Sequence, residues 1–483
     1  MLASKNNKLA ELFGIDLRSL AALRVGLGFA LLTDLLSHAP NLRAHFSDEG
    51  ILPRVASELY YLPGSFSVHL ASGQWQVQGL LLAIQLGLAV MFLIGYRTRF
   101  TTFLSWFLLV SLQNRNPYVL QGADVLLRMM LFWGCFLPLG ARFSFDRWLG
   151  PGGPLPQRLL SGGSLGYMTQ FVLMYFFSAL FKLQVPEWND GRAIAHILEG
   201  DPFTSVFGRW MLQFPLLLKW ATHAVTKAEI LGPFLLFFPI VNGPIRMAVL
   251  AVFMFLQLGF ALCLNLGEFP FIAFVSSFGF LPTWFWERIP RVRLRLPAGW
   301  LQALRRLPAS TSPLSSMKSN LVASCFILLV VYWNLGTLDA WKWKMPSWML
   351  RIVEVTRVDQ TWNLFVNHPL KMRGWYVIPA TLKDGSRVDL FSGGALTYDP
   401  PKLVSATFPD QRWRKYLSGF YYNANRPLRP YYARYLCSSW NAAHKPDRWV
   451  RNFEIVYMWW NSQTDGFERL SLIQWSCDGD RAS

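Results

Sequence analysis

The sequence predicts an all-α polytopic membrane bundle of about nine transmembrane helices, followed by a C-terminal, mostly β extracytoplasmic domain. Hydrophobic residues make up 53% of the chain and charged residues only 15%, against about 25% charged residues in a typical soluble protein. Long apolar runs recur through the first two thirds of the sequence, which is typical of membrane-spanning helices. Beyond residue 338, short segments rich in β-formers alternate with Asp-Gly turns, which favours hairpins.

Nine segments are apolar enough to be predicted as spans, with boundaries that are soft by several residues. They are residues 19–38, 77–95, 100–113, 124–140, 165–182, 228–241, 245–265, 269–283 and 319–337. The segment 206–220 is apolar but short and broken by proline, so we expect it to be interfacial or re-entrant. The predicted domains are a cytoplasmic N-terminal segment (1–18), a transmembrane domain (19–338) and the extracytoplasmic domain (339–483).

The distribution of Lys and Arg predicts the orientation. Basic residues cluster at 4–8, 96–100, 141–147, 242–246 and 286–307, which all fall on one side if the nine spans are real. Short basic loops prefer the cytoplasm, so we expect a multi-pass protein of the cell (inner) membrane with a cytoplasmic N-terminus. Such loops account for the net charge of +18. Because the sequence has no recognisable nucleic-acid-binding motif, we expect no nucleic-acid partner. The polar start of the chain predicts no cleavable signal peptide.

In the C-terminal domain four segments predict strands, and two turns predict hairpins. The strands are "RGWYVIPATL", "SRVDLFS", "NFEIVYMWWNS" and "ERLSLIQWSC", and the turns are "KDGS" and "TDGF". Cys437 and Cys477 both fall in this domain, where an oxidising compartment would permit a disulfide, and the sequence leaves open whether they are bonded. No Cys/His cluster has metal-ligand spacing, so no metal is expected.

Charged residues within spans are costly and often functional. In the first span, Arg24 is expected at the inner interface, while the role of Asp34 stays open. The following loop, 45–54, either covers an outward-facing cavity or simply connects two spans.

A second polar region, residues 111–132, lies between two apolar runs. The turn Asn114-Arg115-Asn116 either holds a polar head group at membrane depth or stitches helices together. Asp124 and Arg128 have the i,i+4 spacing of a helical ion pair.

Lys182 ends the apolar run "MYFFSALFK" and has two interpretations. A lysine at the end of a span commonly snorkels to the interface, and periodicity alone favours that interpretation. A desolvated lysine can instead act as a base near neutral pH.

Several motifs together resemble the horizontally transferred transmembrane (HTTM) domain family, which includes the vitamin K-dependent gamma-glutamyl carboxylases. The matching pieces, within about residues 18–285, are "LRVGLGFALLTDLL" with "FSDEGILPR", "GYRTRFTT", "NRNPYVLQGADVLLRMMLFWGCFLPLGARFSFDRW" and "SALFKLQVPEWNDGRAI". The later "QTWNLFVNHPLKMRGWYV" (360–377) is similar to the segment that opens the lumenal or periplasmic part of bacterial members. The combination is specific, whereas any single piece is weak.

The resemblance implies a catalytic lysine that deprotonates reduced vitamin K, so that reaction with oxygen creates a base strong enough to form a glutamate carbanion. Lys182-Leu183, Trp188 and Asp190-Gly191 match the lysine segment with one extra residue before the tryptophan, so Lys182 is the implied base. Asn116 stands where the carboxylases have a histidine; asparagine can hydrogen-bond a quinol oxygen but cannot relay a proton at neutral pH. The histidines 69, 196 and 223 fall in outer segments, and none is assigned that role.

Two main hypotheses follow. In the first, the chain is a quinol-using, carboxylase-like lyase with reduced vitamin K or menaquinone as cofactor and a secreted or membrane protein as its substrate at the outer face. Its expected ligand-binding residues are Asn114, Arg115, Asn116, Asp124 and Trp188.

In the second hypothesis, a non-catalytic membrane protein binds a lipid or quinone in its bundle and a protein partner through its outer domain. Lys182 is then a charge partner of a residue such as Asp124 or Asp190. A deep Lys182 without a carboxylate nearby favours the first hypothesis, and a paired or lipid-facing Lys182 favours the second. A transporter is a third, weaker interpretation, since no inverted repeat is seen.

Overall fold

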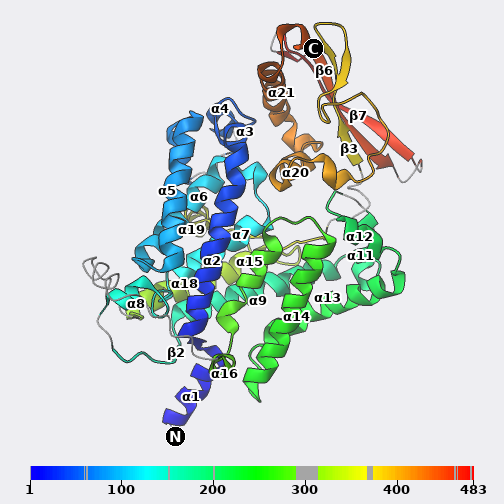
Figure 1. The fold of residues 1–483 in the computed structure, drawn as a ribbon. Helices are drawn as coiled ribbons and strands as arrows, with labels where there is room; N and C mark the ends of the chain where they lie inside the picture. Colours follow the sequence, from blue (N-terminus) through cyan, green and yellow to red (C-terminus); the bar gives the residue numbers. More distant parts are fainter. Residues whose placement is uncertain are drawn as a thin grey trace.

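The protein has a helical bundle and, beyond one end of it, a smaller domain of helices and strands (Figure 1). The N-terminus lies at the opposite end of the bundle from this C-terminal domain. The computed structural model describes residues 2–58, 60, 64–150, 153–199, 202–289, 314–366, 374–461, 464, 466–478 and 481–482.

Five helices in the described residues are long and apolar enough to cross a membrane. They are Leu17–Phe46 (α2, Leu17–His38, continued through a 3-10 turn into α3, Leu42–Phe46), Trp75–Ile94 (α5), Gly162–Leu183 (α9), Asn242–Cys263 (α14) and Met317–Gly336 (α18). The prediction of a helical membrane bundle is confirmed at this level.

The predicted count of nine spans is not confirmed. The remaining predicted spans contain helices that are too short or not apolar enough: α6 (Thr98–Arg115), α7 (Gly122–Gly134), α13 (Pro215–Leu235) and α15 (Phe269–Val275). Helix α13 begins inside the segment that was expected to be interfacial, and it ends before the predicted end of its span.

Short elements connect the bundle helices. The helices are α1 (Leu2–Phe13), α4 (Arg54–Glu58), α8 (Phe145–Leu149), α10 (Pro186–Asn189), α11 (Ala193–Glu199), α12 (Val206–Met211), α16 (Thr283–Arg288) and α19 (Ser347–Thr356), and β1 (Ile15–Asp16) pairs with β2 (Arg158–Leu159). Glycine permits close approach in the bundle: a Cβ on Gly28 of α2 would lie 2.8 Å from the Leu93 Cα of α5. Small residues allow this kind of helix contact in membrane bundles.

The basic loops share one end of the bundle, as expected if they lie on one side of a membrane. Asp146 accepts hydrogen bonds from the backbone N–H groups of Arg97 and Thr98 at 2.8 and 2.7 Å, which joins two of these loops. Most of the basic segment 286–307 lies outside the described residues.

Arg24 is buried at the same end of the bundle. Its guanidinium donates to the carbonyl oxygens of Leu93, Leu139 and Phe143, near the ends of α5 and α7. Carbonyl groups near a helix end lack an intrahelical partner, so Arg24 satisfies backbone groups here. Its expected place at the inner membrane interface stays a prediction.

The C-terminal domain contains an antiparallel sheet with strand order β5-β4-β6-β7-β8, and β3 pairs with β6. The strands are β3 (Gly374–Val377), β4 (Pro379–Leu382), β5 (Arg387–Asp389), β6 (Val450–Asn461), β7 (Gly466–Ser476) and β8 (Arg481–Ala482). Both predicted hairpins form, β4 with β5 and β6 with β7. Two helices were not predicted, α20 (Gln411–Ser418) and α21 (Arg429–Ala443), so the domain is less purely β than expected. Cys437 and Cys477 form a disulfide between α21 and the end of β7.

Helix α20 of the C-terminal domain docks on the bundle (Figure 1), and Ser405, which precedes it, also contacts the bundle through Thr204. Its N-terminus is capped by Asp410, whose carboxylate accepts from the N–H groups of Arg412 and Trp413. The same two residues extend side chains to the bundle: Trp413 donates to Asn41 at 2.9 Å, and Arg412 reaches α2 and α7. The local cap therefore fixes the helix that joins the two domains.

Candidate functional site

Lys182 lies inside the protein, in the last turn of α9. Its side chain is 1% exposed, and its Nζ is 2.6 Å from both carboxylate oxygens of Glu229 on α13. The snorkelling interpretation is therefore wrong, because the amine does not reach the surface. Lys182 does have a charge partner, as the second hypothesis expected, but that partner is Glu229. Of the two carboxylates that were suggested, Asp190 binds Arg192.

The ion pair lies in a small polar cluster within an apolar bundle. Tyr175 and Ser178 precede Lys182 on the same face of α9, and Gln257 of α14 donates to the Tyr175 hydroxyl at 3.0 Å. Ser178 Oγ and Gln257 Oε1 are buried and have no hydrogen-bond partner among the described residues. Three helices thus contribute polar groups around the Lys182–Glu229 pair.

Trp188 covers the Lys182 amine. Its ring centroid lies 4.8 Å from Nζ, within the range of a cation–π contact. The indole N–H donates to the carbonyl oxygen of Phe365 at 3.1 Å. Phe365 forms part of the wall of a cavity, so Trp188 contacts both Lys182 and a residue of that wall.

This interdomain cavity has a volume of about 320 Å³ and lies between the bundle and α20. Its wall is mainly apolar, with a few polar and two cationic side chains. The lining residues are Gln121, Gly122, Ala123, Ile197, Pro202, Phe203, Leu266, Phe269, Asn363, Leu364, Phe365, Arg414, Lys415 and Ser418. Lys182 is not among them. A mostly apolar wall with a few polar groups is typical of small-molecule sites.

Asn114 and Asn116 use their amides to hold neighbouring loops. Asn114 Nδ2 donates to the carbonyl of Phe66 at 2.7 Å, and its Oδ1 accepts from Arg357. Asn116 Nδ2 donates to the carbonyl of His45 at 2.8 Å. These amides bind protein groups that lie next to them and do not line the interdomain cavity.

Arg115, between them, is fully buried. Its Nη1 donates to the Leu52 carbonyl at 2.8 Å, and its Nη2 lies 3.8 Å from Asp48. The turn 114–116 therefore binds loop 45–54. This contact agrees with the expectation that the turn connects segments of the protein. The amides of Asn114 and Asn116 are bound by protein groups, whereas Nε and Nη2 of Arg115 are buried without a hydrogen-bond partner among the described residues. The role of the three residues toward a ligand stays a prediction.

Asp124 belongs to a second buried charge cluster, at the end of the bundle that carries α20. Arg412 donates to Asp34 at 2.6 Å and to Asp124 at 3.1 Å, so that one guanidinium bridges α2 and α7. The other Asp124 oxygen accepts from the N–H of Gln121 at 2.6 Å, within the capping box of α7. Asp124 thus lies close behind the cavity wall but is fully engaged by protein.

The possible Asp124–Arg128 ion pair does not form. Arg128 donates instead to Gln113 at 2.8 Å and to the carbonyl of Asp359 at 2.7 Å. The i,i+4 spacing was compatible with a pair, but partners from other segments are better placed.

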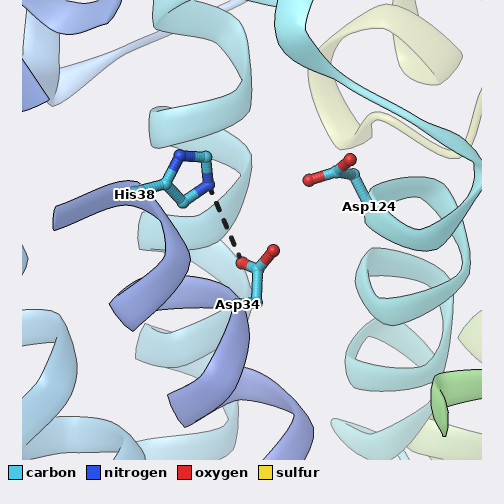
Figure 2. Close-up of side chains that lie close together, drawn as sticks. All are labelled: Asp34, His38 and Asp124. Carbon is cyan, nitrogen blue, oxygen red and sulfur yellow. Dashed lines mark ion pairs between the residues drawn. The ribbon is translucent and has the colours of Figure 1, made fainter. Parts of the chain in front are cut away.

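His38 also faces this cluster, as Figure 2 shows, with its Nε2 4.0 Å from Asp34. Asp34, His38 and Asp124 present metal-type ligand atoms within 4.8 Å of one another. Arg412 already bridges both carboxylates. A divalent cation would compete with that guanidinium, so the trio carries no metal assignment here.

Sequence reasoning missed three residues that the structure brings to these clusters: Glu229, Arg412 and His38. A signal existed for Glu229, since it is an acidic residue in a largely apolar helix, one face of which carries Thr222 and Thr226. No comparable signal marked Arg412, which comes from another domain.

Comparison with protein-family models, with curated proteins and with solved structures found no match to this chain. The resemblance described above therefore remains a hypothesis about the sequence.

Proposed function

We propose that this membrane protein binds an amphiphile, a lipid or a quinone, in the interdomain cavity, and that Lys182 has a structural role. The observation that carries the proposal is the separation of the two features. The cavity of about 320 Å³ lies between the bundle and α20, while Lys182 is bound by Glu229 and covered by Trp188. Ligand pockets in proteins are typically about 300–1,000 Å³ and mostly apolar.

The quinol-dependent lyase chemistry implied by the resemblance is the second candidate. One observation favours it: the Lys182 amine lies 2.6 Å from Glu229, close enough for the carboxylate to accept its proton. Among the residues expected to hold the quinol head group, Asn114 and Asn116 bind backbone carbonyl groups of the protein. We therefore assign no step of a reaction to them.

The proposal keeps the predicted topology, with a cytoplasmic N-terminus in the inner membrane and an extracytoplasmic C-terminal domain. Two observations support it. The N-terminus and the C-terminal domain lie at opposite ends of the bundle (Figure 1). The Cys437–Cys477 disulfide suits an oxidising compartment. A protein partner for this domain stays part of the proposal.

Identification of co-purified ligand tests the proposal. The protein is purified in a non-ionic detergent, and bound amphiphiles are extracted and identified by mass spectrometry. Leu364→Trp places a large ring in the cavity wall, and Leu470→Trp, at an exposed position on β7, is the matched control. We expect the wild type and the control to retain an amphiphile and Leu364→Trp to lose it.

The second candidate is tested on the same preparations. Reduced menaquinone and oxygen are supplied, and epoxide formation is followed for the wild type and Lys182→Ala. We expect no epoxide from either. Epoxide from the wild type that disappears in Lys182→Ala would overturn the structural role of Lys182 and establish the lyase.

A further inference from the structure

We infer that the ligand of the interdomain cavity carries an anionic head group, a carboxylate or a phosphate, on an apolar chain. This inference rests on the proposed function and specifies the class of amphiphile. Two cations, Arg414 and Lys415, line the cavity, and its lining contains no carboxylate among the residues that the structure describes. The charged side chains that line the cavity are therefore all positive, and the carboxylates of Asp124 and Glu268 lie outside the lining.

The two cations differ in what they already bind. Arg414 is buried, and its guanidinium donates to the carbonyl oxygens of Pro202 and Asn265 and to Gln411. Lys415 follows it on α20 and is exposed. Its amine has no hydrogen-bond or ion-pair partner in the described part of the chain. Lys415 is therefore the group that can bind a ligand.

The carboxylate that attracts Lys415 is already bound by other protein groups. Asp124 attracts Lys415 through its charge, but its oxygens accept from Arg412 and from the Gln121 N–H. Part of the Lys415 side chain is exposed, but the surrounding protein removes water from its ammonium and so lowers its pKa. The charge of Asp124 opposes this effect, and that of Arg414 increases it. An anion in the cavity would offset the cost of this partly desolvated ammonium.

The remaining wall indicates where the rest of the ligand lies. Gly122 and Ala123 line the cavity at the start of α7, where the helix dipole favours negative charge. Phe203, Leu266 and Phe269 give the cavity an apolar side. A charged head against α20 and α7, with a hydrocarbon chain along the aromatic side, matches both parts of the wall.

Fluorescence of cis-parinaric acid, a fatty-acid probe, tests the inference in the purified full-length protein. Binding is measured for the wild type, Lys415→Gln, Lys415→Arg and Lys445→Gln, the last being an exposed lysine outside the cavity. Because a charge-assisted hydrogen bond is lost, we expect about tenfold or more weaker binding for Lys415→Gln. Lys415→Arg should restore most of the affinity, and Lys445→Gln should resemble the wild type.

Competitors identify the head group. Displacement by oleate, by oleoyl lysophosphatidate or by both supports the inference and distinguishes a carboxylate from a phosphate. Equal displacement by oleyl alcohol, with unchanged affinity in Lys415→Gln, would overturn the anionic class while leaving a cavity ligand in place. If neither the probe, the competitors nor menaquinone binds the wild type, the proposed function itself fails and the inference fails with it.

Discussion

Two clusters among the described residues pair buried charges in different ways. Lys182 and Glu229 form a closed pair between α9 and α13, inside the bundle. Arg412 enters from the C-terminal domain and bridges Asp34 and Asp124 on α2 and α7. An unpaired charge in a protein interior is strongly destabilising. The first cluster therefore joins helices, whereas the second joins domains.

This difference indicates which contacts position the residues of the cavity wall. The Arg412 cluster fixes α20, and residues 414, 415 and 418 of that helix line the cavity directly. Among the described residues, the Lys182 pair contacts the cavity wall indirectly, through side chains such as Trp188. We therefore expect the cavity to respond more strongly to changes at Arg412 than to changes at Lys182.

The largest effect is expected for Arg412→Ala, because it leaves two carboxylates buried without their cation. The cost should be about 5 kcal/mol at this contact, the upper part of the range for broken buried pairs. We expect α20 to undock, which hydrogen–deuterium exchange would report as faster exchange in α20 and in the adjoining end of α2.

Arg451→Ala provides the control, since Arg451 is exposed on β6 of the same domain. Arg412→Lys keeps the charge but cannot bridge both carboxylates in the same way, so an intermediate exchange rate is expected. Unchanged protection of α20 in Arg412→Ala would contradict the idea that this residue holds the domains together.

A smaller effect is expected for Lys182→Ala, which leaves only Glu229 unpaired. We expect about 3 kcal/mol of lost stability, measured by unfolding with a denaturing detergent. Glu229→Gln should also destabilise, because the Lys182 ammonium then loses its counter-ion. If Lys182→Ala were as stable as the wild type, the pair would not have the structural role assigned to it.

Trp188→Phe should have the smallest effect, since the ring over Lys182 remains and only the hydrogen bond to Phe365 is lost. The expected cost is about 1 kcal/mol, typical of one such bond. Ligand retention should fall only slightly. A loss of ligand as complete as in Leu364→Trp would show that the Lys182 side of the wall controls the cavity after all.

Much of the fold was predictable from local sequence. The apolar helices and the two hairpins follow from composition and spacing within a segment. The site was less predictable, because its contacts join distant residues. Lys182 and Glu229 are 47 positions apart, and Arg412 and Asp34 are 378 apart. Nothing in a local pattern selects Glu229 over Asp124 or Asp190.

The predicted count of nine spans was not confirmed, for a related reason. Apolar runs such as 124–140 and 269–283 resemble spans in sequence, yet the helices there are short and pack inside the protein. An apolar segment can be covered by neighbouring helices as well as by lipid, and sequence alone does not distinguish the two.

The double variant Lys182→Met/Glu229→Leu tests the central claim most directly. Replacing both members of a buried ion pair by apolar residues of similar size is often neutral or stabilising. We predict that the double variant regains near wild-type stability and still retains the amphiphile that co-purifies with the wild type. A stable double variant that has lost its ligand, or that has lost a quinol turnover present in the wild type, would contradict the structural role of Lys182.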